Sequence, residues 1–217
     1  MIHIQDLGSG LDFETTWKKQ QDLALAIREG GERETLFLLE HAPVYTIGRT
    51  RDQSSLLQRD SLPHPVIVIN RGGQATFHGP GQLVGYAVLD LKNHHQDLHL
   101  HLRRLEEVLL LTLNQYGVRA QRREGLTGVW IDDRKIASLG VGVRKWISQH
   151  GFAINIASAC LPPFQAITPC GLSGVQVTSL ETELGEKVSI ADFKNTLCPI
   201  FQRIFATHPK TSFPSEI

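Results

Sequence analysis

Successive short runs of apolar residues lie between residues 118 and 156, and they restrict the possible folds more than any other part of the chain. The runs cover residues 118–122, 127–131, 135–143 and 152–156. Apolar and polar side chains alternate within them and the connections are short, as in neighbouring strands of an antiparallel sheet. The tightest connection, Asp132-Asp133-Arg134, has the length of a hairpin turn. The sequence therefore predicts an antiparallel meander here.

Helices are expected on both sides of this meander. Residues 97–116 carry leucines at helical spacing and are followed by Gly117, a typical helix end. Residues 13–28 show a second apolar stripe, which stops before Gly30. A third helix is predicted after Ser189, which forms a capping pair with Asp192, and Pro199 is expected to kink or split it.

The remaining apolar runs are short and read as strands at residues 1–7, 35–40, 44–47, 66–69 and 86–91, the last two buried. Residues 48–64 are mostly polar and are expected to form a loop that acts as a lid. No repeat or linker divides the sequence. We therefore expect one α+β (α/β) domain over residues 1–217, with mixed or antiparallel sheets flanked by helices.

Charge and composition narrow the possible partners. The 22 basic and 22 acidic side chains give a formal net charge of zero, so no overall field attracts nucleic acid or an anionic membrane. No signal peptide or membrane-spanning run is recognisable. The cysteines are three in number and lack metal-type spacing, which suits reduced thiols. We expect a cytoplasmic protein with no nucleic-acid and no membrane partner.

A glycine-rich stretch, residues 70–91, lies between two of the apolar runs. Its glycines let the main chain approach a ligand closely, and Arg71, Gln74, Thr76 and His78 supply polar groups. It has neither the GxxxxGK[ST] pattern nor the GxGxxG spacing of nucleotide-binding loops, so a different kind of ligand is expected. A glycine-rich connection with no ligand is the other interpretation.

Cys170 is the candidate nucleophile. Pro169 and Gly171 flank it, so its thiol is expected on a tight turn beside backbone N–H groups able to bind an oxyanion. Cys160 and Cys198 are interpreted as small buried apolar residues. Lys135 or His78 would activate the thiol, although spacing alone favours the interpretation of Lys135 as an exposed hairpin lysine.

Four histidines are concentrated in the segment HHQDLHLH. They are His94, His95, His99 and His101, and two of them stand four residues apart, as helical metal ligands do. No cysteine or carboxylate stands nearby at metal-site spacing. We therefore interpret the cluster as a solvated helix start and predict no metal site.

Three motifs together resemble the lipoyl(octanoyl) transferase family, the octanoyl-[acyl-carrier-protein]:protein N-octanoyltransferases. They are RGGQATFHGPGQLVGYAVLDL, GVWIDDRKIASLGVGVRKWISQHGFAINI and ITPCGLSGVQVTSL, and HAPVYTIGR agrees with them. The resemblance extends over about residues 35–180 with the motifs in family order. Phe77 is a mild departure, since an aromatic residue with a hydroxyl is common there.

The resemblance implies a single α/β domain similar to the catalytic domains of lipoate and biotin protein ligases. It also implies that Cys170 carries the acyl chain as a thioester and that Lys135 tunes the thiol. The acyl pocket that it implies is lined by Arg71, Gly72, Gly73, Gln74, Ala75, Thr76, Phe77, His78, Ser138, Leu139, Gly140, Gly151, Phe152 and Ala153.

The implied reaction moves an octanoyl group from octanoyl-acyl carrier protein to the target lysine of apo lipoyl domains, the first step of endogenous protein lipoylation. The acceptors are lipoyl domains of 2-oxoacid dehydrogenase complexes and the glycine cleavage H protein. No cofactor, ATP or metal is expected, because one thioester is exchanged for another and then for an amide. The acidic carrier would dock on a basic rim formed by Arg49, Arg51, Arg122, Arg123, Arg144 and Lys145.

Three other functions stay open at this point. An ATP-dependent lipoate or biotin ligase on the same fold would bind a nucleotide and have no use for the thiol. A binding module for lipoyl domains would form no acyl adduct. A thiol hydrolase would pair Cys170 with His78 and release free octanoate.

Overall fold

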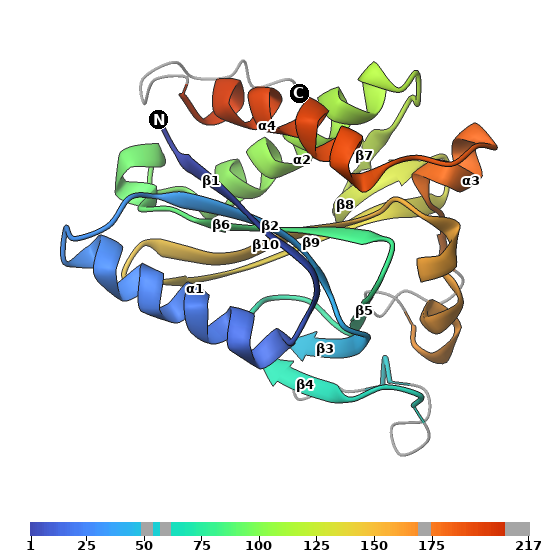
Figure 1. Cartoon of the computed structure of the whole chain (residues 1–217), viewed down its shortest axis with the longest axis horizontal. Coiled ribbons are helices and arrows are strands. Elements are labelled where there is room, and N and C mark those ends of the chain that lie inside the picture. The colour runs from blue at the N-terminus through green and yellow to red at the C-terminus, as the bar shows by residue number, and fades with distance from the viewer. Residues whose placement is uncertain (49–53, 57–61, 169–174, 207–217) are drawn as a thin grey trace.

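The computed structural model describes residues 1–48, 54–56, 62–168 and 175–206, and its main sheet contains the predicted meander (Figure 1). The strand order is β1-β2-β6-β10-β9-β8-β7. Only β1 and β2 run parallel along this path, and β11 pairs parallel with β9 off it. The bounds are β1 His3–Leu11, β2 Thr35–His41, β6 Gln82–Val88, β7 Gln121–Arg123, β8 Leu126–Ile131, β9 Arg134–Arg144, β10 Ile147–Asn155 and β11 Gln176–Val177. The mixed α+β architecture is as predicted.

A second, three-stranded sheet has the order β4-β3-β5, with β3 Val44–Gly48, β4 Val66–Ile69 and β5 Thr76–His78. The glycine-rich stretch therefore crosses from this small sheet into β6 of the main sheet. The strand predicted at residues 66–69 is confirmed, but the prediction that it is buried is wrong, since Val68 is exposed and only Ile69 is buried. The strand predicted at residues 86–91 begins earlier, at Gln82, and it ends at Val88, before the 3-10 turn of Leu91–His94.

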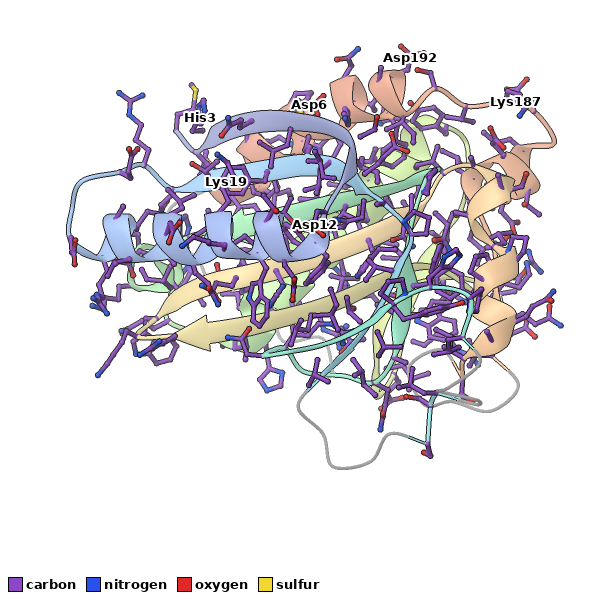
Figure 2. All side chains as sticks on the ribbon, turned by 60° about the horizontal axis from the view of Figure 1, so that its bottom comes forward. His3, Asp6, Asp12, Lys19, Lys187 and Asp192 are labelled. Atoms are coloured by element: carbon purple, nitrogen blue, oxygen red, sulfur yellow. The ribbon has the colours of Figure 1, made fainter. Side chains whose placement is uncertain are left out.

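The predicted helices are present and begin at side-chain caps. They are α1 Phe13–Arg28, α2 Leu98–Gln115 and α4 Ile190–Ala206, and a short α3 covers Leu180–Leu184. Asp12 lies where β1 passes into α1 (Figure 2), and its carboxylate accepts the backbone N–H of Thr15. The Ser189 hydroxyl accepts the N–H of Asp192 at the start of α4. Among the described helices, none is long and apolar enough to span a lipid bilayer.

Pro199 does not split the last helix, so that part of the prediction is wrong. The helix α4 is continuous through Pro199. Phe193 and Leu197 before the proline and Phe201 after it are fully buried in one core. Their burial stabilises both halves in a single helix and outweighs the backbone hydrogen bond that the proline lacks.

The two faces of the main sheet carry different layers (Figure 1). The helices α2 and α4 cover one face, and the core between them and the sheet is apolar. The helix α1 covers the other face, with the small sheet beyond it. A second core lies under α1, and a third joins the small sheet to Phe164 and Ile167. The candidate site lies on the α1 side, where the small sheet meets the main one.

Candidate active site

A narrow cavity, with a volume of about 50 Å³, lies where the glycine-rich stretch meets the main sheet. Most of the residues predicted to form the acyl pocket line it, from β5, β9, β10 and the connection before β5. They are Arg71, Gly73, Gln74, Thr76, His78, Ser138, Leu139, Gly140, Gly151, Phe152 and Ala153. Segments more than 60 positions apart in the sequence thus form one wall.

Two of the predicted pocket residues lie elsewhere. Ala75 and Phe77 are buried in the third core, where the Phe77 ring lies against Tyr45 and Phe164. Because residues alternate in direction along β5, Thr76 and Phe77 point to opposite faces of the small sheet. The mild family departure at Phe77 therefore falls in a core and not in the wall of this cavity.

A second cavity of about 310 Å³ adjoins the first, and both are lined by Gly73, Leu139 and Gly140. It lies beneath the first turns of α2, which contribute Leu98 and Leu102. The predicted pocket residue Gly72 lines this cavity, and so does Lys135. Gly73, Leu139 and Gly140 therefore border both the predicted acyl pocket and the cavity lined by the predicted catalytic lysine.

Glycines of β9 let the connection at residues 70–73 lie directly on the main sheet. A Cβ atom at Gly142 would stand 2.4 Å from the Asn70 carbonyl oxygen, and one at Gly140 would stand 3.0 Å from Cδ of Arg71. The Gly72 N–H donates to the Val141 carbonyl at 3.3 Å. Side chains on this part of β9 would push the connection off the sheet and open the wall of the cavity.

The Arg71 guanidinium fastens the connection to the small sheet. Nη1 donates to the carbonyls of Gly72 and Gln74, at 2.9 and 3.0 Å. Nη2 donates to both the carbonyl and the hydroxyl of Thr46, each at 3.0 Å. These contacts hold the loop in one shape, so Arg71 has a structural part in forming the cavity wall.

His78 belongs to a chain of hydrogen bonds with one possible direction. The Thr178 carbonyl can only accept, so Asn155 Nδ2 donates to it at 2.9 Å, and Asn155 Oδ1 accepts from Gln82 Nε2 at 2.9 Å. Gln82 Oε1 then accepts the Nδ1–H of His78 at 2.8 Å. This leaves His78 Nε2 to accept from the Thr46 hydroxyl at 3.3 Å. We call this series the Thr178–Thr46 chain.

Burial holds the pKa of His78 well below its usual range, so the ring is neutral at pH 7. Both of its nitrogens have partners within the Thr178–Thr46 chain, and neither is free to accept a proton from a thiol. The geometry therefore favours a shaping role for His78 over the role of general base.

Two further histidines are buried beside the cavity. Nδ1 of His41 donates to the Leu11 carbonyl at 3.0 Å, so Nε2 accepts from the Tyr86 hydroxyl at 2.7 Å. Burial lowers the pKa of His41 to about 4 and raises that of Tyr86. His150 has a positive φ of 63°, unusual for a residue with a side chain, and burial lowers its pKa to about 3. Both rings are neutral, as an apolar ligand would require.

Lys135 is buried, with 2% of its surface exposed, so it is not an exposed hairpin lysine. Nζ donates to the Thr127 carbonyl at 3.0 Å and lies 5.1 Å from the centre of the Trp130 ring. The Lys135 backbone pairs with Val177 of β11. A buried ammonium needs contacts of this kind, and Lys135 also lines the second cavity.

Cys170 lies outside the described residues, and so do Arg49 and Arg51 and most of the predicted lid. On either side of the segment that contains Cys170, the Thr168 N–H donates to the Ser55 carbonyl at 2.7 Å and β11 pairs with β9 at Lys135. Cys160 is buried as predicted, and burial raises its pKa to about 12. Cys198 is half-buried against the apolar core.

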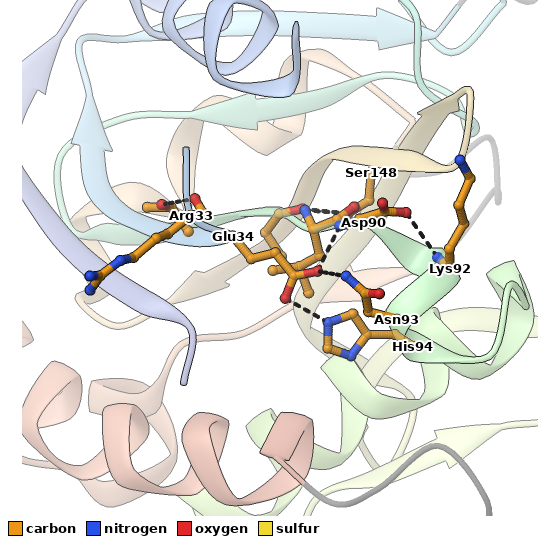
Figure 3. Close-up of polar contacts among 10 residues, drawn as sticks. Arg33, Glu34, Asp90, Lys92, Asn93, His94 and Ser148 are labelled. Carbon is orange, nitrogen blue, oxygen red and sulfur yellow. Dashed lines mark hydrogen bonds and ion pairs between the residues drawn. The ribbon is translucent and has the colours of Figure 1, made fainter. Parts of the chain in front are cut away.

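The interpretation of the histidine segment as a solvated helix start is wrong for two of its four members. His94 is buried in a 3-10 turn, and its Nε2 lies 2.9 Å from the carboxylate of Glu34 (Figure 3). His101 is buried in α2 with its ring against Phe205. Among the described residues, no group of three or more potential ligands is placed to hold a metal ion.

The described residues of the predicted basic rim differ in their contacts. Arg122 donates to the carboxylates of both Glu106 and Glu107, so its charge is neutralised on the protein itself. Arg123 lies over the Trp130 ring at 5.1 Å. Arg144 at the end of β9 and Lys145 in the turn before β10 are both exposed.

Sequence reasoning did not find four residues of the cavity wall, Phe13, Ile69, Tyr86 and His150. Tyr86 and His150 carried a usable signal, because a hydroxyl and an imidazole within otherwise apolar buried strands need partners. Phe13 and Ile69 carried none, since either would fit an ordinary core.

Known proteins resemble this chain over most of its length. Residues 12–202 match the lipoyl protein ligase A/B catalytic domain. An octanoyltransferase of Geobacter metallireducens is 46% identical over 198 residues, which cover 91% of each chain. An octanoyltransferase of Geotalea uraniireducens is 48% identical over 193 residues, 89% of this chain and 88% of that one.

Solved structures share the fold at much lower identity. A lipoate-protein ligase A bound with ATP has a TM-score of 0.71 at 17% identity, over 99% of this chain and 90% of that one. Biotin protein ligase from Aquifex aeolicus in complex with biotin and ATP has a TM-score of 0.60 at 13% identity, over 95% and 71%. The predicted likeness to the lipoate and biotin ligase fold is confirmed. The chain belongs to the lipoyl protein ligase A/B catalytic domain family, and within it the chain is an acyltransferase related to the octanoyltransferases.

Proposed function

We propose that this acyltransferase moves an octanoyl group from octanoyl-acyl carrier protein to the target lysine of apo lipoyl domains, through a thioester on Cys170. The observation that supports this most is the burial of Lys135 at a cavity that adjoins the narrow cavity beneath the glycine-rich connection. The similarity to octanoyltransferases supports the choice of acyl group. The acceptors would be lipoyl domains of 2-oxoacid dehydrogenase complexes and the glycine cleavage H protein.

In the first half-reaction the Cys170 thiolate attacks the carbonyl carbon of the donor thioester. The bond from that carbon to the pantetheine sulfur breaks, and the leaving thiolate takes a proton from the Lys135 ammonium. The products are the octanoyl-enzyme, a free pantetheine thiol and a neutral Lys135 amine. An ammonium beside the thiol also stabilises the thiolate before attack.

In the second half-reaction the neutral amine of the acceptor lysine attacks the thioester carbon. Its surplus proton passes to Lys135, the new C–N bond forms and the Cys170 thiolate leaves. Lys135 is an ammonium again and the cycle is closed. Replacing a thioester with an amide is downhill, so the scheme consumes no ATP.

The narrow cavity would hold the acyl chain between β9 and β10. Its wall is formed by Leu139, Phe152 and Ala153 together with neutral rings, which cost little to bring against methylene groups. A volume of about 50 Å³ is small for eight carbons, so the chain would extend into the adjoining cavity or displace side chains of the wall.

The test is intact-protein mass spectrometry after mixing the enzyme with octanoyl-acyl carrier protein. We expect an octanoyl adduct on the wild type and on Cys160→Ala, and none on Cys170→Ala. Cys160 is the matched control, because burial raises its pKa to about 12 and leaves it without reactive thiolate. An adduct that survives in Cys170→Ala would show that the nucleophile is misassigned.

The same mixture separates the competing functions. Free octanoate with ATP as a working donor would indicate a ligase, and net release of octanoate without an acceptor would indicate a hydrolase. Binding of the apo lipoyl domain without any adduct would indicate a binding module.

A further inference from the structure

Glu106 is a carboxylate in the interior of the protein, on the side of α2 that faces β8. Only 1% of its surface is exposed. Its Oε2 accepts from Arg103 Nη1 at 2.7 Å and from Arg122 Nε at 3.1 Å. Its other oxygen, Oε1, accepts the backbone N–H of Gly128 at 3.0 Å. One oxygen therefore accepts from two guanidinium groups, and the other accepts from the main chain of β8.

The Gly128 N–H belongs to the same peptide group as the Thr127 carbonyl, and that carbonyl accepts from Lys135 Nζ at 3.0 Å. In a trans peptide the N–H and the C=O point in opposite directions. The Thr127–Gly128 peptide group therefore lies between a buried carboxylate and a buried ammonium, with a hydrogen bond to each.

Gly128 also leaves the space that the Lys135 side chain occupies. A Cβ atom at Gly128 would stand 2.4 Å from Cε of Lys135 and 2.9 Å from the Ala137 carbonyl oxygen. The Trp130 ring lies 5.1 Å from Nζ. The position of Nζ therefore depends on where the main chain of β8 lies at Thr127 and Gly128, and Glu106 fixes that position.

We propose that Glu106 is a positioning residue for Lys135 and acts through the Thr127–Gly128 peptide group. A carboxylate that accepts the N–H polarises the amide and makes its carbonyl a stronger acceptor for the ammonium. The carboxylate also places a negative charge on the far side of the same peptide group. The inference rests on the proposed function, because it assigns Glu106 a part in the work of Lys135.

The test compares Glu106→Gln with Glu107→Gln. Glutamine keeps the size of Glu106 and removes its charge. Glu107 is the matched control, because it is the next residue of α2 and also binds Arg122, at 2.6 Å, but the structure records no contact between it and Gly128. Two quantities are measured: kcat and KM for octanoyl transfer, and the pH midpoint of Cys170 alkylation by iodoacetamide.

For Glu106→Gln we expect kcat to fall about tenfold with KM within about twofold, because the lysine is misplaced and substrate binding is not. The alkylation midpoint should rise by about half a pH unit, since a less well placed ammonium stabilises the thiolate less. Glu107→Gln should change kcat by less than about twofold and leave the midpoint in place. A loss of packing alone would not move the midpoint.

If Glu106→Gln matches Glu107→Gln in both kcat and the pH midpoint of alkylation, the inference is overturned and the proposed function is left intact. A wild type that forms no octanoyl adduct would overturn both. Thermal melts accompany each variant, and if Glu106→Gln melts below the assay temperature, Glu106→Asp replaces it. Aspartate keeps the charge but is one methylene shorter, so the same fall in kcat is expected, and its absence would count against the inference.

Discussion

The two faces of the main sheet bury different kinds of side chain. Under α2 and α4 the core is formed by aliphatic and aromatic residues, among them Leu36, Leu38 and Ile154. Under α1 and the small sheet, apolar residues alternate with buried His41, His78 and Gln82, which have hydrogen-bond partners. The first face mainly shields apolar area from water, with His101 and Glu106 of α2 as buried polar exceptions, and the second holds polar groups in fixed positions around the narrow cavity.

This difference indicates where substitutions should affect stability and where they should affect activity. A shortened side chain on the apolar face leaves a void, whose effect is mainly on the free energy of unfolding. A lost hydrogen bond on the polar face leaves its partners unpaired and releases the wall of the cavity. Substitutions on the two faces should therefore differ in the ratio of activity lost to stability lost.

The largest change in stability is expected from Leu38→Ala. Leu38 is fully buried on the face covered by α2 and α4, and its truncation should lower the free energy of unfolding by about 3 kcal/mol. The kcat/KM of the folded enzyme should stay within about twofold. Urea unfolding and steady-state assays measure the two quantities, and a kcat/KM that falls with stability would break the distinction between the faces.

A smaller loss of stability with a larger loss of activity is expected from Gln82→Met. Methionine fills the same space but leaves His78 Nδ1 and Asn155 Oδ1 without their Gln82 partner. The free energy of unfolding should fall by about 2 kcal/mol, and kcat/KM should fall about tenfold because the wall around Thr46 and Arg71 loses its support. Full activity in this variant would mean that the Thr178–Thr46 chain only stabilises the fold.

The smallest effect concerns His101, one of the polar residues of α2 that are buried on the apolar face. Neither ring nitrogen has a hydrogen-bond partner among the described residues, and burial lowers its pKa to about 3. The unfolded chain takes up a proton near pH 6.5 while the folded protein does not. This histidine's contribution to stability is therefore complete above pH 6.5 and is lost as the pH falls from 6.5 towards 3.

Replacement of His101 by leucine should remove this pH dependence without breaking a hydrogen bond. Between pH 6.5 and pH 5.5 the wild type should lose about 1 kcal/mol more unfolding free energy than His101→Leu. His41 and His150, whose pKa values burial also lowers, keep their contributions in both proteins. If the wild type and His101→Leu lose the same unfolding free energy between the two pH values, His101 titrates normally in the folded state.

Local patterns predicted the parts of the fold that depend on neighbouring residues. The alternation and short turns of residues 118–156 identified the meander, and the capping pair of Ser189 and Asp192 marked the start of α4. The motif resemblance identified most of the residues that line the narrow cavity. These signals are short-range, so they need no knowledge of which strands lie side by side.

The rest depends on contacts between distant segments. Nothing near Lys135 in the sequence indicates that Gly128 makes room for it, or that Glu106 of another element fixes that glycine. Gln82 and Asn155 are 73 positions apart, and their hydrogen bond exists only because β6 and β10 are neighbours. Apolar burial around Pro199 overrode a reliable local rule for the same reason.

The Thr178–Thr46 chain also fixes which of its groups donate and which accept. A row of hydroxyl, amide and imidazole groups, like a row of water molecules in ice, usually has two equivalent orderings and can switch between them. Here a carbonyl that can only accept closes one end, and the Arg71 guanidinium that can only donate closes the other. One ordering remains, so the row has no residual entropy and conducts no proton. Protons that enter or leave during acyl transfer must then travel by another route, which is the part that the proposed function assigns to Lys135.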